Sequence, residues 1–231
     1  MRVELVSHTM DPERTVAAAT RLCYSASDID QIREAIDDAE AARLIQKVLE
    51  LGHFSVLEHA SFTFAIEGIS RACSHQLVRH RMASFSQQSQ RYVKMHDFEP
   101  AMPASVRRNE DAARRFGQVM ESLRAEYDAL VEAGIPAEDA RYLLPNAAET
   151  KLLMTANARS LLNFFEIRLC TRAQWEIRRL ADLMLEKVKV VAPNIFSEAG
   201  PTCETKGYCR EGQKSCGRAA TRQYPEDSET D

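Results

Sequence analysis

Glycine is scarce in this sequence, at 8 of 231 residues, and the glycine-rich motifs that cradle nucleotide phosphates are missing. Neither a Walker loop nor a G-x-G-x-x-G motif occurs, so a bound nucleotide is not held in the P-loop or Rossmann manner. The G-x-S-x-G elbow of the serine hydrolases is also missing. These absences leave side chains, not glycine-rich backbone, as the candidate binding groups.

Long apolar runs are missing too. No stretch approaches the ~20 residues that a helix needs to span a bilayer. The first residues show no positive region followed by an apolar stretch, so no signal peptide is expected. The six cysteines are spread along the chain, unlike the dense framework of a small secreted protein. We therefore expect a cytoplasmic protein with no membrane partner.

A general excess of positive charge is also absent. The net charge of −4 and the pI near 5.9 argue against nucleic acid as a partner. The basic character is local, because residues 68–96 contain no Asp or Glu, and residues 79–92 contain three Arg, one His, three Ser and three Gln. Guanidinium groups suit phosphate or carboxylate, and hydroxyls and amides can bind the remaining oxygens. This segment predicts a site for a small anion, with a solvated basic loop as the alternative.

Hydrophobic periodicity and capping residues predict an α+β fold, a helix-rich domain with a small central antiparallel or mixed sheet. Strands are expected at residues 3–6, 61–67 and 151–156. Helices are expected at residues 12–22, 32–51, 70–78, 111–133, 137–144, 157–170 and 173–191. Residues 1–197 are expected to form a single domain, followed by a polar, cysteine-containing tail at 198–231 that is at most partly ordered.

A second candidate site lies in the helix expected after residue 157. Arg159 and Asn163 are four residues apart and share one face of this helix, while Leu161 and Phe165 belong to a separate apolar stripe. One face can therefore be buried while the other offers guanidinium and amide groups to a ligand. An amphipathic surface helix with its polar face in water is the alternative.

Two segments have some features of a metal site. Residues 52–59 contain two histidines and a glutamate but lack the i, i+4 histidine pair of a helical zinc site. Cys203, Cys209 and Cys216 are spaced more widely than zinc-binding cysteines, and no histidine nearby completes a set of four. We expect no metal, with structural histidines and isolated thiols; a metal or redox role for the cysteines is the alternative.

Arg79-His80-Arg81, followed after seven residues by Ser89, resembles the signature of the flavin-dependent thymidylate synthases. Other segments resemble that family in the same order, as far as about Phe196: Gly52-His53 to Glu58-His59, Gln76, Arg91-Tyr92, Asn157-Ala158-Arg159-Ser160, Asn163, Arg168 and Ala173-Gln174-Trp175-Glu176. Many members of the family have Asn-Glu where this chain has Ser86-Gln87. Glutamine keeps an acceptor at this position but carries no charge.

The resemblance implies a methyltransferase that converts dUMP to dTMP, with methylene-tetrahydrofolate as carbon donor, NADPH as reductant and tightly bound FAD as hydride carrier. It also implies that residues 1–197 are the catalytic domain of a homotetramer. The cofactor-binding residues that it implies are His53, Ser55, Arg79, His80, Arg81, Gln87, Asn157, Arg159 and Asn163. The dUMP-binding residues that it implies are Gln76, Arg79, Gln87, Gln88, Ser89, Gln90, Arg91, Arg141 and Arg168.

Arg168 is also the implied catalytic residue, since an arginine beside the uracil ring would stabilise negative charge that develops there. Only Cys73 and Cys170 lie within the shared motifs, and neither has an activating base beside it in the sequence, which agrees with a flavin route that needs no cysteine nucleophile. The resemblance assigns the tail no role, so a chain ended near Ala199 is expected to keep flavin binding and turnover. A non-catalytic nucleotide-binding module is the alternative function, and an RNA-binding protein is opposed by the net charge.

Overall fold

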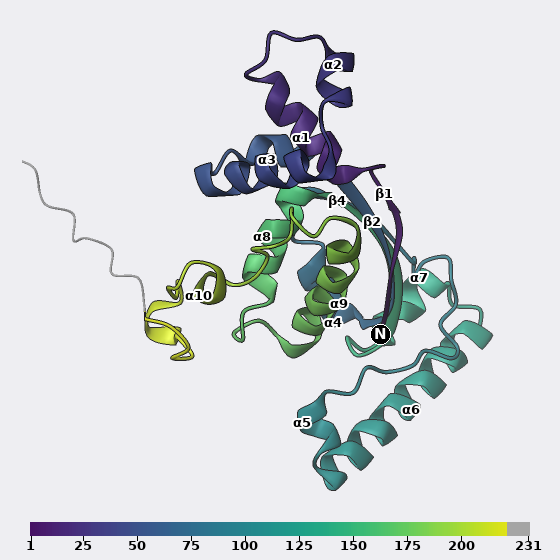
Figure 1. Ribbon diagram of the computed structural model, residues 1–231. Coiled ribbons are helices and arrows are strands. Elements are labelled where there is room, and N and C mark those ends of the chain that lie inside the picture. The colour runs from purple at the N-terminus through teal and green to yellow at the C-terminus, as the bar shows by residue number, and fades with distance from the viewer. Residues whose placement is uncertain (221–231) are drawn as a thin grey trace, which may run out of the picture. The chain divides into compact units, whose positions relative to one another are not determined.

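A computed structural model describes residues 1–220 (Figure 1). The fold is α+β, as expected, with helices predominating and the strands forming a small antiparallel sheet. The chain divides into two compact units, one made of Met1–Ser7 and Thr63–Thr155, the other of His8–Phe62 and the chain from Ala156 onward. The last part of the expected tail, residues 221–231, lies outside the described residues.

The first unit contains most of the sheet. Its strands are β1 (Arg2–His8), β2 (Ser61–Ser70), β3 (Ala83–Gln87) and β4 (Glu149–Asn157), in the order β1-β2-β4-β3 (Figure 1). The strands expected at residues 3–6, 61–67 and 151–156 are confirmed, each somewhat longer than expected. The apolar residues alternate along β2 because one face of the strand is buried: Phe64 and Ile66 are fully buried, whereas Ala65 between them is not.

Strand β3 was not expected from the sequence. Residues 83–87 lack the run of β-branched residues that marks a strand, and their side chains are alternately half-buried and exposed. The strand lies at one edge of the sheet and needs only β4 as its partner; the Gln88 amide continues this pairing with a hydrogen bond of 3.0 Å to the Lys151 carbonyl. Residues 83–88 are therefore held by the sheet, whereas Arg79, Arg81 and Arg91 lie outside the strand and are exposed.

The helices expected at residues 70–78 and 111–133 are confirmed. The helix expected at residues 137–144 is instead a short helix followed by a 3-10 turn, and a short helix at residues 104–107 was not expected. Ser70 caps α4 (Arg71–Leu77) by accepting a hydrogen bond from the Cys73 amide, as expected for a serine at this position. The long helix α6 (Glu110–Glu132) begins after Asn109, which accepts from the Ala112 amide. The remaining short elements are α5 (Ala104–Arg107), α7 (Ala137–Ala140) and the 3-10 turn η2 (Arg141–Leu143).

The second unit begins with a helical layer in which one expectation was wrong. Helix α1 (Pro12–Leu22) packs against α3 (Asp38–Leu51), but the single helix expected at residues 32–51 is broken, and α2 (Ile29–Glu34) is separate. The break comes from Asp37, whose carboxylate accepts from the Glu40 amide at 2.8 Å and so begins α3 anew. Gly52 ends α3 in the left-handed region, at φ 71°.

The remaining elements of this unit carry the second candidate site. They are the 3-10 turn η1 (Phe54–His59), α8 (Ala158–Arg168), α9 (Trp175–Val191), α10 (Thr202–Thr205) and η3 (Gly212–Lys214). Helix α8 packs against both η1 and α9. Three buried rings, those of Phe62, Phe165 and Phe196, pack edge to face at centroid distances of 5.3 and 5.9 Å.

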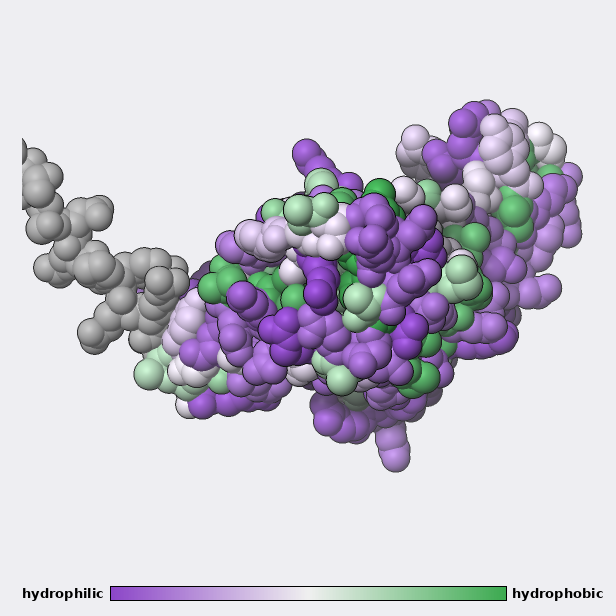
Figure 2. Space-filling view, turned by 45° about the horizontal axis from the view of Figure 1, so that its top comes forward, coloured by the Kyte–Doolittle hydropathy of each residue, from purple (hydrophilic) through white to green (hydrophobic). Residues whose placement is uncertain are grey.

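The described surface is mainly polar. Figure 2 shows one face on which hydrophilic residues predominate and hydrophobic residues occur in small groups between them. Scattered apolar residues of this kind are ordinary on a protein surface. None of the helices in residues 1–220 has the length and hydropathy to cross a membrane.

Glu13 links the two chain segments that make up the second unit. Its carboxylate accepts hydrogen bonds from the Asn194 backbone and side-chain nitrogens, each at 2.6 Å, and from the Ile195 amide at 3.3 Å. These bonds tie α1 to the turn that follows α9, and both partners are at least half-buried.

Glu13→Ala should therefore lower the free energy of unfolding by about 2–3 kcal/mol, because it leaves several donors without their charged acceptor. Urea denaturation of the full chain measures this change. Glu50→Ala is the matched control, since Glu50 accepts only from the exposed Gln46 amide, and its effect should stay within about 0.5 kcal/mol. Equal losses in the two variants would contradict a special role for Glu13.

Candidate active site

The residues expected to form the site are divided between the two units. The first unit holds the residues from the signature segment and η2: Gln76, Arg79, His80, Arg81, Gln87, Gln88, Ser89, Gln90, Arg91 and Arg141. The second unit holds the residues from η1 and α8: His53, Ser55, Asn157, Arg159, Asn163 and Arg168. Each unit therefore holds one set of the expected residues, and the contacts of some members show how their side chains are positioned.

The signature arginines lie in the turn that connects α4 to β3. Gln76 is in the last turn of α4, and the His80 amide donates to the Leu77 carbonyl at 3.1 Å. Arg79 and Arg81 follow on the exposed side of this turn. Within residues 1–220 neither guanidinium forms an ion pair with a carboxylate. Both can therefore bind an anion without first losing a protein partner.

Gln87 points inward from the end of β3. Its side-chain nitrogen donates to the Ser74 hydroxyl at 3.0 Å and to the Thr150 hydroxyl at 3.2 Å. The Ser74 hydroxyl donates its own proton to the Arg71 carbonyl, so it can only accept from Gln87. A glutamate here would place a carboxylate against that lone pair, which gives a physical reason for glutamine in this chain.

Ser89, Arg91 and Arg141 are brought together around Glu138. The Arg91 Nε and Nη2 atoms each lie 2.8 Å from Glu138 Oε2, and Arg141 Nε donates to the Glu138 carbonyl at 3.0 Å. The Ser89 hydroxyl accepts from the Arg91 amide at 3.2 Å. This arrangement forms an anion-binding corner in which the Glu138 carboxylate occupies the fork of Arg91.

Arg71 belongs to the same corner, although it lies outside the sequence motifs of the candidate site. The amide of Arg71 donates to the Ala148 carbonyl and that of Ala72 to the Asn146 carbonyl, which seats the start of α4 against the segment after η2. Arg71 Nη1 is buried and has no hydrogen-bond partner among the described residues. Burial, and then the positive charge of Arg141, lowers the pKa of Arg71.

Two arginines that approach each other with no carboxylate between them repel, and a buried guanidinium donor without a partner is costly. Such an arrangement is stabilised by an anion that both guanidinium groups can bind. A sequence signal for Arg71 does exist, since it is the first arginine of the acid-free residues 68–96.

In the second unit, α8 positions the other set. Asn157 caps this helix, because its side-chain oxygen accepts from the Ser160 amide at 2.9 Å. The Ala158 amide donates to the Ala60 carbonyl at 2.8 Å, which joins α8 to η1 and so to the segment of His53 and Ser55. Arg159 Nη1 lies 2.6 Å from Glu58 Oε1 of η1. The cap leaves the side-chain nitrogen of Asn157 free to contact a ligand.

A cavity of about 590 Å³ lies beside the polar face of α8, within the usual range for small-molecule sites. Arg159 and Asn163 line it together with Phe54 of η1, the end of α3 and residues beyond Glu198. Its lining joins guanidinium and amide donors to an aromatic and an aliphatic surface. These groups can bind a flat ring system that carries an anionic substituent.

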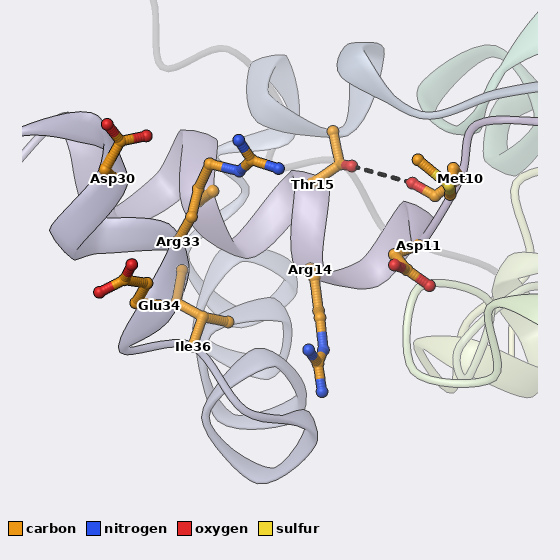
Figure 3. A pocket seen from close by; sticks show the side chains of 9 residues that line it. Met10, Asp11, Arg14, Thr15, Asp30, Arg33, Glu34 and Ile36 are labelled. Carbon is orange, nitrogen blue, oxygen red and sulfur yellow. Dashed lines mark hydrogen bonds between the residues drawn. The ribbon is translucent and has the colours of Figure 1, made fainter.

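A second cavity, of about 570 Å³, lies between α1 and α2 (Figure 3). Charges of both signs line it, and the Thr15 hydroxyl at its edge donates to the Met10 carbonyl at 3.3 Å. None of the residues expected from the sequence lies there. Arg14, one of the lining residues, is paired with Asp38, which raises the pKa of Arg14.

The tail cysteines do not assemble. Cys203 is half-buried, Cys209 is buried and Cys216 is exposed, and none forms a disulfide. Among residues 1–220 no group of three or more His, Cys, Asp or Glu side chains could hold a metal ion. A hydrogen bond with the Thr171 side chain lowers the pKa of Cys216.

Known proteins resemble this chain over nearly its whole length. A chain named flavin-dependent thymidylate synthase from Geobacter sulfurreducens is 55% identical over 222 residues, covering 95% of each chain. Chains with the same name from Nitratidesulfovibrio vulgaris (96% of each chain covered) and Clostridium tetani (95% of this chain, 94% of the other) are 49% and 45% identical. These matches extend into residues 198–231, because the uncovered share is too small to omit that segment. The family model described as thymidylate synthase complementing protein matches residues 4–194, and the chain belongs to this family.

Proposed function

We propose that this chain is a flavin-dependent thymidylate synthase that converts dUMP to dTMP. Its membership of the family and the names of relatives that match it over nearly their whole length support this activity. The observation that carries the proposal is the anion-binding corner of Arg71, Arg91 and Arg141, which suits the phosphate of a nucleotide. Methylene-tetrahydrofolate, NADPH and FAD complete the proposed reaction.

Binding of dUMP is proposed to involve the whole first-unit set. The phosphate would lie against Arg71, Arg91 and Arg141, with the Ser89 hydroxyl as a further donor. Glu138 must then release Arg91, because a carboxylate and a phosphate compete for the same fork. Gln76, Arg79, Gln87, Gln88 and Gln90 are proposed to contact the rest of the nucleotide.

The second-unit set is proposed to contact the flavin, and the family resemblance makes Arg79, His80, Arg81 and Gln87 proposed flavin-binding residues as well. The lining of the cavity beside α8 fits such a group, since Arg159 and Asn163 offer donors and Phe54 offers an apolar face. His53, Ser55 and Asn157 complete this set. When bound, the flavin supplies the hydride that reduces the new one-carbon unit on the uracil ring. Arg168, at the end of α8, is proposed to stabilise negative charge on that ring.

The homotetramer, the cytoplasmic location and the limits of the catalytic domain at 1–197 remain parts of this proposal. The family model ends at residue 194, close to the proposed limit, whereas the relatives match into residues 198–231. A non-catalytic nucleotide-binding module is the second candidate, since the anion-binding corner alone could serve a protein that only binds dUMP. The two candidates differ in whether the protein binds a flavin that can be reduced.

Protein incubated with FAD should show flavin absorbance that NADPH bleaches without oxygen. Adding dUMP and methylene-tetrahydrofolate should then restore the oxidised spectrum and form dTMP, because the hydride has a path to the nucleotide. Absorbance spectra and chromatography of the products measure both steps. Binding of dUMP without any flavin uptake would support the binding module instead.

Arg91→Ala should weaken dUMP binding by about 1.5–3 kcal/mol, the scale of a hydrogen bond to a charged group. Titration calorimetry measures this loss, and deoxyuridine, which lacks the phosphate, is the comparison ligand. An equal loss for deoxyuridine would remove Arg91 from the phosphate.

Arg71→Met tests whether Arg71 of the same corner contributes to dUMP binding or to the stability of the fold. It should also weaken dUMP binding, while the unfolding temperature without ligand stays equal or rises, because a buried cation near Arg141 is removed. A variant that loses stability but keeps its affinity for dUMP would assign Arg71 a structural role.

Arg168→Lys should slow methyl transfer to dUMP by about tenfold to a hundredfold, the scale of losing one transition-state donor. Lysine keeps the positive charge but loses the planar fork, so it cannot restore an oriented contact. Reduction of the flavin by NADPH should change much less, because that half-reaction does not involve the uracil ring. Near-normal methyl transfer in this variant, measured by rapid quench, would exclude Arg168 from the mechanism.

A further inference from the structure

The C-terminal segment forms one wall of the cavity beside α8. Glu198, Gly200, Thr205, Lys206 and Arg210 line this cavity opposite the polar face of the helix. The segment therefore faces the same space as the residues proposed to hold the flavin. The sequence assigned no role to it.

Several contacts fix the position of the C-terminal segment. It begins at Phe196, whose buried ring packs against Phe165 of α8. Cys209 is buried, and its amide donates to the Ala220 carbonyl at 2.7 Å. Gly200 fits tightly against α10, since a side chain there would place its first carbon 3.3 Å from Thr205 Cγ2. These contacts hold the wall in place beside α8.

Two cations of the segment meet the same carboxylate on α8. Arg210 forms an ion pair with Glu166, and Lys206 Nζ lies 3.8 Å from Glu166 Oε2. Glu166 is three residues beyond Asn163 and seven beyond Arg159, so all three share one face of the helix. Without these cations, Glu166 would present a negative charge to the cavity.

Three cations and three carboxylates line the cavity, and two of the cations, Lys206 and Arg210, come from the C-terminal segment. The cations are Arg159, Lys206 and Arg210, and the carboxylates are Glu50, Glu166 and Glu198. Removal of Lys206 and Arg210 leaves Arg159 alone against the three carboxylates. A pyrophosphate or phosphate group would then be repelled, because charges that are partly removed from water interact strongly.

We propose that residues 198–210 complete the pocket for the flavin nucleotide, and that Lys206 and Arg210 are positioning residues that neutralise Glu166 so that an anionic cofactor can enter. The inference rests on the proposed function and replaces the expectation that a chain ended near Ala199 keeps its flavin. It makes the segment part of cofactor binding although none of its residues belongs to the signature motifs.

The test is a double-variant rescue. Lys206→Ala combined with Arg210→Ala should weaken FAD binding by roughly tenfold, because an uncompensated carboxylate now faces the anion. Adding Glu166→Gln to this variant should restore most of the affinity, since the carboxylate that Lys206 and Arg210 neutralise is then gone. Quenching of flavin fluorescence in titrations of flavin-free protein measures each dissociation constant. Lys214→Ala is the matched control, because Lys214 is an exposed tail cation that does not line the cavity.

Truncations give a second reading. A chain ended after Ala220 keeps every contact described above and should bind FAD like the full chain, whereas a chain ended after Ala199 should bind it weakly. Unchanged affinity in the Lys206/Arg210 double variant would overturn the inference, and so would a triple variant that is not rescued, which would mean a structural role for the segment. A wild-type protein that takes up no FAD would overturn the proposed function, and the inference with it; wild-type binding with unaffected variants contradicts the inference alone.

Discussion

The partly buried guanidinium group of Arg71, held near the positive charge of Arg141, is the constraint on which the anion-binding corner depends. The backbone hydrogen bonds from α4 to the segment after η2 hold Arg71 beside Arg141, and residues 68–96 supply no acidic side chain to separate them. Burying part of a guanidinium group in this way costs stability. The sheet and the capped start of α4 keep the arrangement in place, so the folded chain presents its arginines before a ligand arrives. A site that is organised in advance loses less entropy when it binds.

In the second unit, by contrast, the charged residues at the candidate site are paired. Every charged residue on the polar face of α8 has a partner from a distant part of the chain: Arg159 pairs with Glu58, and Glu166 pairs with Lys206 and Arg210. The other face of the helix is apolar and packs Phe165 against Phe196. The buried face fixes the position of the helix, and the paired face sets the charge that a ligand meets. A small change in these pairs therefore changes the cavity without changing the fold.

Glu138 and Glu166 have comparable roles in the two units. Each carboxylate lies beside a candidate binding site, and each is held by arginine, with additional help from Lys206 for Glu166. Glu138 occupies a fork that a phosphate would use, whereas Glu166 is itself covered by the tail cations. The first carboxylate competes with the proposed substrate, and the second has to be neutralised for the proposed cofactor.

The local features of the structure could be predicted from the sequence alone. The alternation in β2, the caps at Ser70 and Asn157, and the glycine that ends α3 follow from backbone chemistry that acts over a few residues, and the structure has all of them. The family was also readable from the sequence, because its motifs are contiguous and occur in order. The break at Asp37 could have been read from the same capping chemistry, but the apolar periodicity on both sides concealed it.

The long-range features depend on tertiary contacts and could not be predicted from the sequence. Strand β3 forms because β4 lies beside it, and no hydrophobic periodicity in residues 83–87 predicts a strand. Arg71 and its like-charged neighbour Arg141 are far apart in the sequence. The ion-pair partners of Arg91 and Glu166 are equally distant, so no spacing rule relates these residues. The wall formed by residues 198–210 was missed for the same reason. Local propensity acts within a few residues of the chain, whereas charge pairing and burial depend on which distant segments the fold brings together.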